Sequence, residues 1–143
     1  MSFLIDHRIA STCFELGDWP LSRVFLKNDA NYPWLILVPR QENTQEIHQL
    51  SPSFGHLLMD EIQALSSIVN LYFKPDKLNV GALGNIVPQL HVHVIARFQS
   101  DPMWPHGVWQ VNDLPVLAYE KNSLATLLSD LQCLIEDKGP VML

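Results

Sequence analysis

The stretch "NIVPQLHVHVIARF", residues 85–98, decides the fold, because it combines an apolar strand pattern with polar side chains at every second position. Residues i and i+2 of a β-strand lie on the same face. A strand over residues 89–98 therefore places Gln89, His91 and His93 in one row. The opposite face of this strand carries the apolar side chains of Leu90, Val92 and Val94. The pattern predicts a strand with one face in the core and one chemically active face.

The rest of the chain predicts short strands and two long helices. Residues 3–10 are expected to form a short helix or turn. Further strands are predicted at residues 11–18, 21–28, 34–39 and 77–84. One helix is predicted from the N-cap Ser51 and Pro52 up to Pro75, and a second over 122–137, because apolar residues recur there at helical spacing. Strands in runs and few helices are typical of an α+β fold with a mainly antiparallel sheet, here in a single domain, 1–143.

The composition limits the classes of function. Of the 143 residues, 48% are hydrophobic and 17% charged, which favours a folded chain over a disordered one. The net charge of −6 argues against a general nucleic-acid or anionic-membrane binder, which needs a basic surface. The start of the chain lacks the pattern of a secretory signal, and no apolar run is long enough to span a membrane. Cys13 and Cys133 have no CxxC spacing, so reduced thiols and a cytoplasmic location are expected.

The histidine row suits chemistry on a phosphate. A neutral imidazole with one nitrogen donating its hydrogen presents a lone pair on the other nitrogen, and its ordinary pKa lies near neutrality. Such a ring can form a covalent histidine–phosphorus intermediate. The glycine-rich "NVGALGNI" (79–86) precedes the row, and glycine turns let backbone N–H groups approach an anion.

Two other interpretations of the histidines stay open at this point. They can be polar residues on a half-exposed sheet face. They can also be two ligands of a zinc ion, which needs a third protein ligand. The histidines available as that third ligand are His7, His48, His56 and His106, and none has a telling spacing.

Several ordered blocks resemble the histidine triad (HIT) superfamily, whose signature is His-φ-His-φ-His-φ-φ with φ apolar. "QLHVHVI" (89–95) matches it with glutamine in place of the first histidine. Asn79 and Gly81, followed by "GNI" (84–86), resemble the blocks that precede the triad. "VFLKNDANYPWLILVPR" (24–40) resembles the family's ribose-side strand, turn and apolar strand. The tail "DPMWPHGVW" is similar to a bacterial subgroup of HIT-like hydrolases, and the likeness covers about residues 20–98 best.

This resemblance implies a fold, an activity and a set of site residues. The fold is α+β with a five-stranded antiparallel sheet and two principal helices, usually in a homodimer. The substrate is a small nucleotide, commonly a purine nucleotide, hydrolysed or transferred at the α-phosphate without a cofactor or metal. His91 matches the nucleophile, and His93 the histidine that contacts phosphate and whose backbone carbonyl orients the nucleophile. Asn28 or Asp29 matches the ribose-binding residue. The phosphate-side residues are matched by Asn79, Gly84 and Asn85.

Three departures from the family pattern concern the substrate. Gln89 can donate and accept hydrogen bonds but cannot carry a proton charge. Asn85 is shorter than the usual glutamine, and Ile86 replaces a hydroxyl donor. A changed leaving group or slower turnover is expected. The alternatives are a non-catalytic module that binds a nucleoside monophosphate, and a metal-dependent His-x-His hydrolase.

A few aromatic and basic residues near the row complete the expectations. Trp34, Trp104 and Trp109 can flank a base, although large rings more often belong to a core or interface. Trp104 and Trp109 are favoured as pocket walls because their loop directly follows the histidine strand. Arg97 falls on the histidine face at the end of the strand and is expected to be a surface residue.

Overall fold

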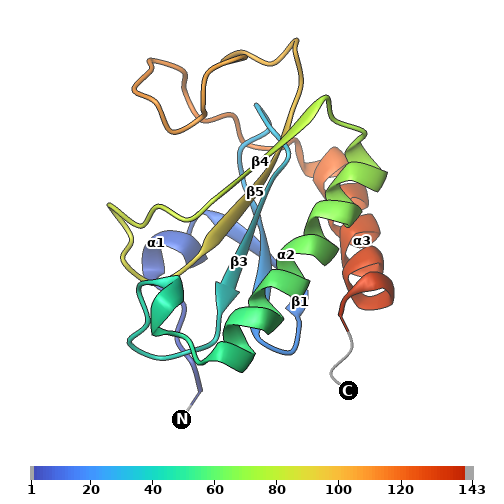
Figure 1. Ribbon diagram of the computed structural model, residues 1–143. Coiled ribbons are helices and arrows are strands. Elements are labelled where there is room, and N and C mark those ends of the chain that lie inside the picture. Colours follow the sequence, from blue (N-terminus) through green and yellow to red (C-terminus); the bar gives the residue numbers. More distant parts are fainter. Residues whose placement is uncertain (1, 141–143) are drawn as a thin grey trace.

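The computed structural model describes residues 2–140 and contains a five-stranded antiparallel sheet of order β1-β2-β3-β5-β4. The strands are β1 (Cys13–Asp18), β2 (Ser22–Lys27), β3 (Trp34–Pro39), β4 (Lys77–Gly81) and β5 (Val92–Arg97). The helices are α1 (His7–Ala10), α2 (Pro52–Phe73) and α3 (Lys121–Lys138), with a 3-10 turn η1 at Ile47–Gln49. Figure 1 shows α2 and α3 side by side against one face of the sheet. The predicted α+β fold is confirmed.

Helix α2 begins and ends where the sequence predicts. The Ser51 side chain accepts a hydrogen bond from the backbone N–H of Phe54, and Pro52 occupies the first turn, where no N–H partner is needed. At the other end Lys74 adopts a left-handed conformation with φ 52°, and Pro75 follows it. The apolar stripe of α2 is buried against the sheet through Leu58, Leu65, Ile68 and Val69.

Apolar side chains pack on both faces of the sheet. On the helix side, the core takes alternate residues of β2, β3 and β5: Val24, Leu26, Leu35, Leu37, Val92, Val94 and Ala96. On the opposite side, a second cluster holds Phe25, Trp34, Ile36 and Ile95 with Ile9, Tyr32 and Val108. Strand β3 is buried along its whole length, as its continuous apolar run predicts. The second face is where α1 and the loop after β5 lie.

Strand β5 is shorter than predicted. It begins at Val92 instead of residue 89, because the backbone N–H of Leu90 donates to the carbonyl of Thr44 in a loop and leaves the sheet ladder. Pro88, which has no N–H, lies two residues earlier. The chain therefore enters the sheet only just before His93, and the prediction that Gln89 continues the row of the sheet face is wrong.

Arg97 is buried, which corrects its expected place on the surface. Its side chain is 1% exposed, and its Nε and Nη2 donate to the Asp101 carboxylate at 2.8 and 3.0 Å. Its Nη1 donates to Asn79 Oδ1 at 2.8 Å, and the guanidinium also faces the rings of Tyr32 and Trp104. This cluster joins β4, β5 and the loop after β5.

None of the helices within residues 2–140 has the length and apolar character that crossing a membrane requires.

Candidate functional site

A cavity of about 500 Å³ opens on the sheet face away from α2 and α3. His91 and His93 line it together with residues of α1, the ends of β2 and β3, the loop 83–87 and Trp109. The rings of His91 and His93 lie 4.8 Å apart between centroids, and both residues are buried, at 7% and 8% exposure. The structure thus brings the two predicted histidines into one cavity.

His91 is oriented by a backbone carbonyl. Its Nδ1 lies 2.7 Å from the carbonyl oxygen of Gln89, an atom that can only accept a hydrogen bond. Nδ1 therefore carries the hydrogen, and Nε2 keeps its lone pair. The resemblance implies that the carbonyl of His93 has this task, and the structure instead assigns it to the carbonyl two residues before His91, where the chain bends into β5.

His93 is held as a neutral ring of one tautomer. The indole N–H of Trp34 donates to its Nδ1 at 2.9 Å, and an indole nitrogen can only donate. The hydrogen of neutral His93 is therefore on Nε2. Burial, and to a smaller extent the charges of His91 and Lys27, lowers the pKa of His93 to about 3. His93 is thus a fixed hydrogen-bond donor near neutral pH.

Replacing Trp34 with phenylalanine is expected to release this tautomer. The ring contact with His93 remains, but Nδ1 loses its donor and becomes free to take up a proton, so the His93 pKa rises from about 3, while burial still holds it below its ordinary value. Imidazole ¹⁵N chemical shifts, followed from pH 3 to pH 8, measure both the tautomer and the pKa.

The matched control for this experiment is Trp109→Phe. Trp109 packs on the same ring, with centroids 5.4 Å apart, and makes no hydrogen bond to it. The His93 shifts should stay as in the unmodified protein. Identical His93 spectra in the Trp34→Phe and Trp109→Phe variants would contradict the assigned hydrogen bond.

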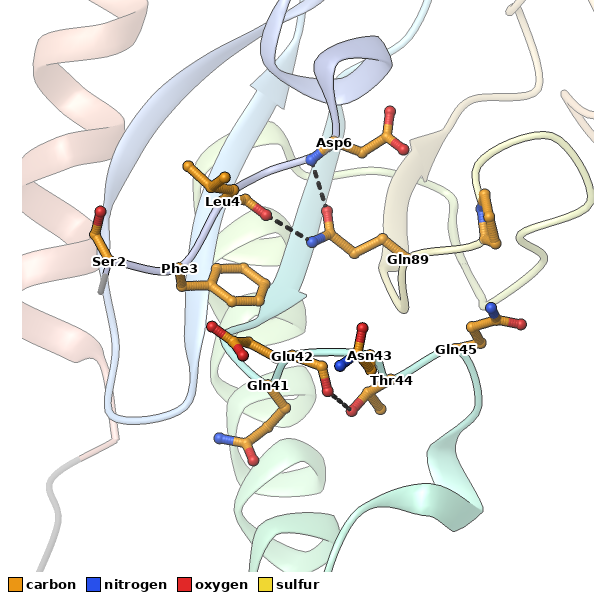
Figure 2. Close-up of a pocket in the computed structure, with 11 residues that line it drawn as sticks. Ser2, Phe3, Leu4, Asp6, Gln41, Glu42, Asn43, Thr44, Gln45 and Gln89 are labelled. Atoms are coloured by element: carbon orange, nitrogen blue, oxygen red, sulfur yellow. Dashed lines mark hydrogen bonds between the residues drawn. The ribbon is translucent and has the colours of Figure 1, made fainter.

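Gln89 does not line the cavity that the histidines share. Its amide points toward Leu4 and Asp6 of the N-terminal segment (Figure 2). Its Oε1 accepts the backbone N–H of Asp6 at 2.8 Å, and its Nε2 donates to the carbonyl of Leu4 at 2.9 Å. The amide is suited to this because it donates and accepts at once. In this structure its side chain fastens the N-terminal segment, and only its backbone carbonyl reaches the proposed nucleophile.

Replacing Gln89 with alanine is expected to cost stability more than turnover. Two partly exposed hydrogen bonds are lost, which lowers the free energy of unfolding by about 1 kcal/mol, while the carbonyl that orients His91 remains. Urea unfolding and steady-state kinetics measure the two effects. A loss of turnover of more than about 100-fold at unchanged stability would place the amide in the chemistry instead.

The other predicted site residues divide into two groups. Gly84 and Asn85 line the cavity, and Gly84 has φ +77°, with a backbone oxygen 3.2 Å from where a Cβ would be. Asn79 does not line it and accepts from Arg97 instead. The Asn28 Oδ1 accepts the backbone N–H of residue 119, and Asp29 accepts from residues 31 and 117. The assignment of Asn28 or Asp29 to ribose binding stays a prediction.

Lys27 and Arg8 line the cavity, and neither is among the residues predicted from the sequence to form the site. The signal for Lys27 is the alternation of β2, which places it on the face opposite Val24 and Leu26. The sequence gives no comparable signal that Arg8 belongs to the site, because Arg8 lies far from the histidines along the chain. Its guanidinium bonds Asp6 and the carbonyl of Ile86, so it joins α1 to the loop 83–87.

The predicted pocket-wall tryptophans have separate places. Trp109 lines the cavity and packs edge-on against both Trp34 and His93, whereas Trp104 lies outside it against Arg97. Trp34, which the sequence leaves open between base-flanking and core roles, belongs to the second core cluster at 8% exposure and also lines the cavity.

Within residues 2–140, no group of three or more His, Cys, Asp and Glu side chains is arranged to hold a metal ion. The metal-dependent alternative requires a third protein ligand beside His91 and His93. The described part of the chain places no third ligand of these types there.

Comparisons with known proteins agree with this fold. The family model described as HIT domain matches residues 10–100. A histidine triad protein from Bradyrhizobium japonicum is 41% identical over 94% of this chain and 99% of its own, with a TM-score of 0.89. One from Marinobacter aquaeolei VT8 is 40% identical over 97% and 100%, with a TM-score of 0.90. One from Sinorhizobium meliloti 1021 is 35% identical over 90% and 94%, with a TM-score of 0.85. No curated protein matches the chain.

Proposed function

Because the chain belongs to the HIT domain family, which includes nucleotide hydrolases and transferases, we propose that it is a hydrolase or nucleotidyltransferase acting at the α-phosphate of a nucleotide conjugate. The proposed nucleophile is His91 Nε2. The observation that carries the proposal is the 2.7 Å contact from His91 Nδ1 to the Gln89 carbonyl, which leaves the Nε2 lone pair free.

The first step forms a nucleotidyl-histidine. The Nε2 lone pair of His91 attacks the α-phosphorus, and the bond from phosphorus to the leaving group breaks with its electrons on that group. The imidazole becomes cationic while Nδ1 keeps its hydrogen, and the Gln89 carbonyl accepts from that charged ring. The leaving group takes its proton from solvent, because His93 has its only hydrogen on Nε2 and resists protonation.

The second step restores the free histidine. Water attacks the phosphorus, gives its proton to solvent, and the bond from phosphorus to His91 Nε2 breaks. In a transferase another acceptor takes the place of water. Throughout, His93 Nε2–H is suited to donate to a phosphoryl oxygen, and the loop at Gly84 and Asn85 supplies backbone groups to the same cavity.

His91 lies where two cavities meet, which suits a substrate with two parts. A second cavity of about 400 Å³, lined by Gln45, Glu46, His48 and Gln89 among others, shares Leu83, Gly84 and His91 with the first. One cavity can hold the nucleotide and the other the leaving group. This supports conjugates such as nucleoside phosphoramidates and dinucleoside polyphosphates over simple nucleotides.

The test is a panel of adenosine and guanosine phosphoramidates and dinucleoside polyphosphates, assayed for release of the nucleoside monophosphate. The proposal expects turnover of at least one conjugate. Tight AMP or GMP binding by calorimetry with no turnover across the panel would favour the non-catalytic binding module. Neither binding nor turnover would exclude both functions.

The proposal includes a purine nucleotide as substrate, a homodimer and a cytoplasmic location. Apolar side chains between Trp109 and α3 are widely exposed, among them Val111 at 103%, Val116 at 69% and Leu117 at 56%. Exposed apolar surface of this kind is typical of an interaction surface, which supports a second copy of the chain as partner. Light scattering coupled to size exclusion measures the oligomeric state.

A further inference from the structure

We propose that Lys27 forms an anion subsite in the histidine cavity, so that the substrate carries a phosphate or carboxylate besides the phosphorus that His91 attacks. This inference rests on the proposed function. It concerns a charged group in the cavity that the proposed reaction sequence does not use.

The cavity has positive charge and no acidic side chain to balance it. Lys27 and Arg8 both line it, and none of the described residues lining it is Asp or Glu. This is notable in a chain of net charge −6. A cationic concave site with partly apolar walls concentrates anionic ligands.

Of the two cations, Arg8 is neutralised by an ion pair with Asp6, and Lys27 has no such partner within residues 2–140. Arg8 donates from Nε and Nη2 to Asp6 and from Nη1 to the carbonyl of Ile86. Within residues 2–140 the Lys27 ammonium has neither a hydrogen bond nor an ion pair, although the residue is partly buried. Its nitrogen lies 5.1 Å from the Trp34 ring centroid, a contact that holds the side chain against the cavity wall.

The backbone of Lys27 lies two strands away from the strand of His93, about 10 Å across the sheet. Across the sheet, Lys27 ends β2, Trp34 begins the neighbouring β3, and His93 lies on β5 beyond it. Trp34 and His93 are 5.6 Å apart between centroids, and His93 and His91 are 4.8 Å apart. Two ring side chains thus separate the ammonium from the nucleophile. The group at Lys27 belongs to another part of the substrate.

The chemistry of that group is an oxyanion. An ammonium binds phosphate or carboxylate as a point charge with up to three hydrogen bonds. A phosphate on the ribose and a carboxylate on the leaving group both satisfy this, and they place the anion on different parts of the substrate.

The ribose arm of the experiment measures binding by calorimetry. The ligands are adenosine and guanosine 5′-monophosphates and the corresponding 2′,5′- and 3′,5′-bisphosphates. The leaving-group arm compares kcat/KM for the 5′-phosphoramidates of aspartate and asparagine. In one of the two arms, the ligand with the additional anionic group (the bisphosphate or the aspartate conjugate) is expected to be favoured by about tenfold or more over the ligand without it. The reason is that hydrogen bonds to a charged group are strong.

Lys27→Met keeps the apolar stem on Trp34 and removes the charge. It should abolish the preference and leave the 5′-monophosphate affinity within about threefold, while Lys27→Arg should retain part of the preference. The control is Lys121→Met, at the exposed start of α3. Thermal unfolding verifies that each variant folds.

The outcomes separate this inference from the proposed function. If no ligand with a second anion is preferred, or if Lys27→Met weakens all ligands by one factor, the subsite is overturned. If a Lys27-dependent preference exists but no nucleotidyl adduct forms on His91, the subsite stands and the covalent chemistry fails. If a nucleotidyl adduct forms on His91 but no Lys27-dependent preference exists, the covalent chemistry stands and the subsite is overturned.

Discussion

Replacing His91 with alanine is expected to reduce turnover of nucleotide conjugates by at least about 10³-fold, because the atom that forms the covalent intermediate is removed. The neighbouring His93 cannot substitute for it. His93 is held neutral with its lone pair on Nδ1 engaged by Trp34, and its pKa lies at about 3. Single-turnover kinetics with a conjugate from the panel measures the chemical step directly.

Two further variants make this expectation specific. His91→Asn retains an amide that can donate toward the Gln89 carbonyl but has no nucleophilic nitrogen, so it should be as inactive as His91→Ala. His56→Ala, on an exposed position of α2, should keep its rate within about twofold. Substantial turnover by folded His91→Asn would exclude His91 as the nucleophile.

Replacing Arg97 with methionine is expected to lower the free energy of unfolding by about 3–5 kcal/mol, since one partner of a buried ion pair is removed. The Asp101 carboxylate, 3% exposed, would remain charged without its two-bond partner, and Asn79 would lose its donor. Asp101 also accepts backbone N–H groups of the loop that follows β5. Chemical denaturation measures the loss.

Arg23→Met is the matched control for this ion pair. Arg23 binds Asp18 with the same two-bond geometry, at 2.7 and 3.0 Å, but the two side chains are 24% and 44% exposed. Solvent screens such a pair, so its loss should cost less than about 1 kcal/mol. Equal losses in the two variants would contradict the assigned importance of burial.

The elements with strong local signals were predictable from the sequence. Helix α2 runs over Pro52–Phe73 because its cap residues and apolar spacing agree. Strand β3 at 34–39 was predictable because a short apolar run between prolines suits a strand covered on both faces. In each case local propensity and tertiary packing favour the same structure.

The parts that depend on distant segments were not predictable. The predicted row of Gln89, His91 and His93 on one sheet face does not extend to Gln89, because the backbone N–H of Leu90 bonds to Thr44 outside the sheet. The Gln89 amide bonds to the N-terminal segment instead. Alternation alone places Arg97 on the histidine face, but its burial depends on Asp101 in a loop whose conformation has no periodic signal. The turn after β2 has the same difficulty: Asn28 does not line the cavity, because its side chain accepts from residue 119, 91 positions along the chain.

The covalent intermediate is the central claim, and intact-protein mass spectrometry tests it most directly. The protein is mixed with a nucleoside phosphoramidate and quenched within one turnover in alkaline denaturant, which preserves a phosphorus–nitrogen bond. The account predicts a mass increase of one nucleotidyl group, located on His91 by peptide mapping and absent from His91→Asn. Turnover without any adduct on this time scale, or an adduct on another residue, would contradict it.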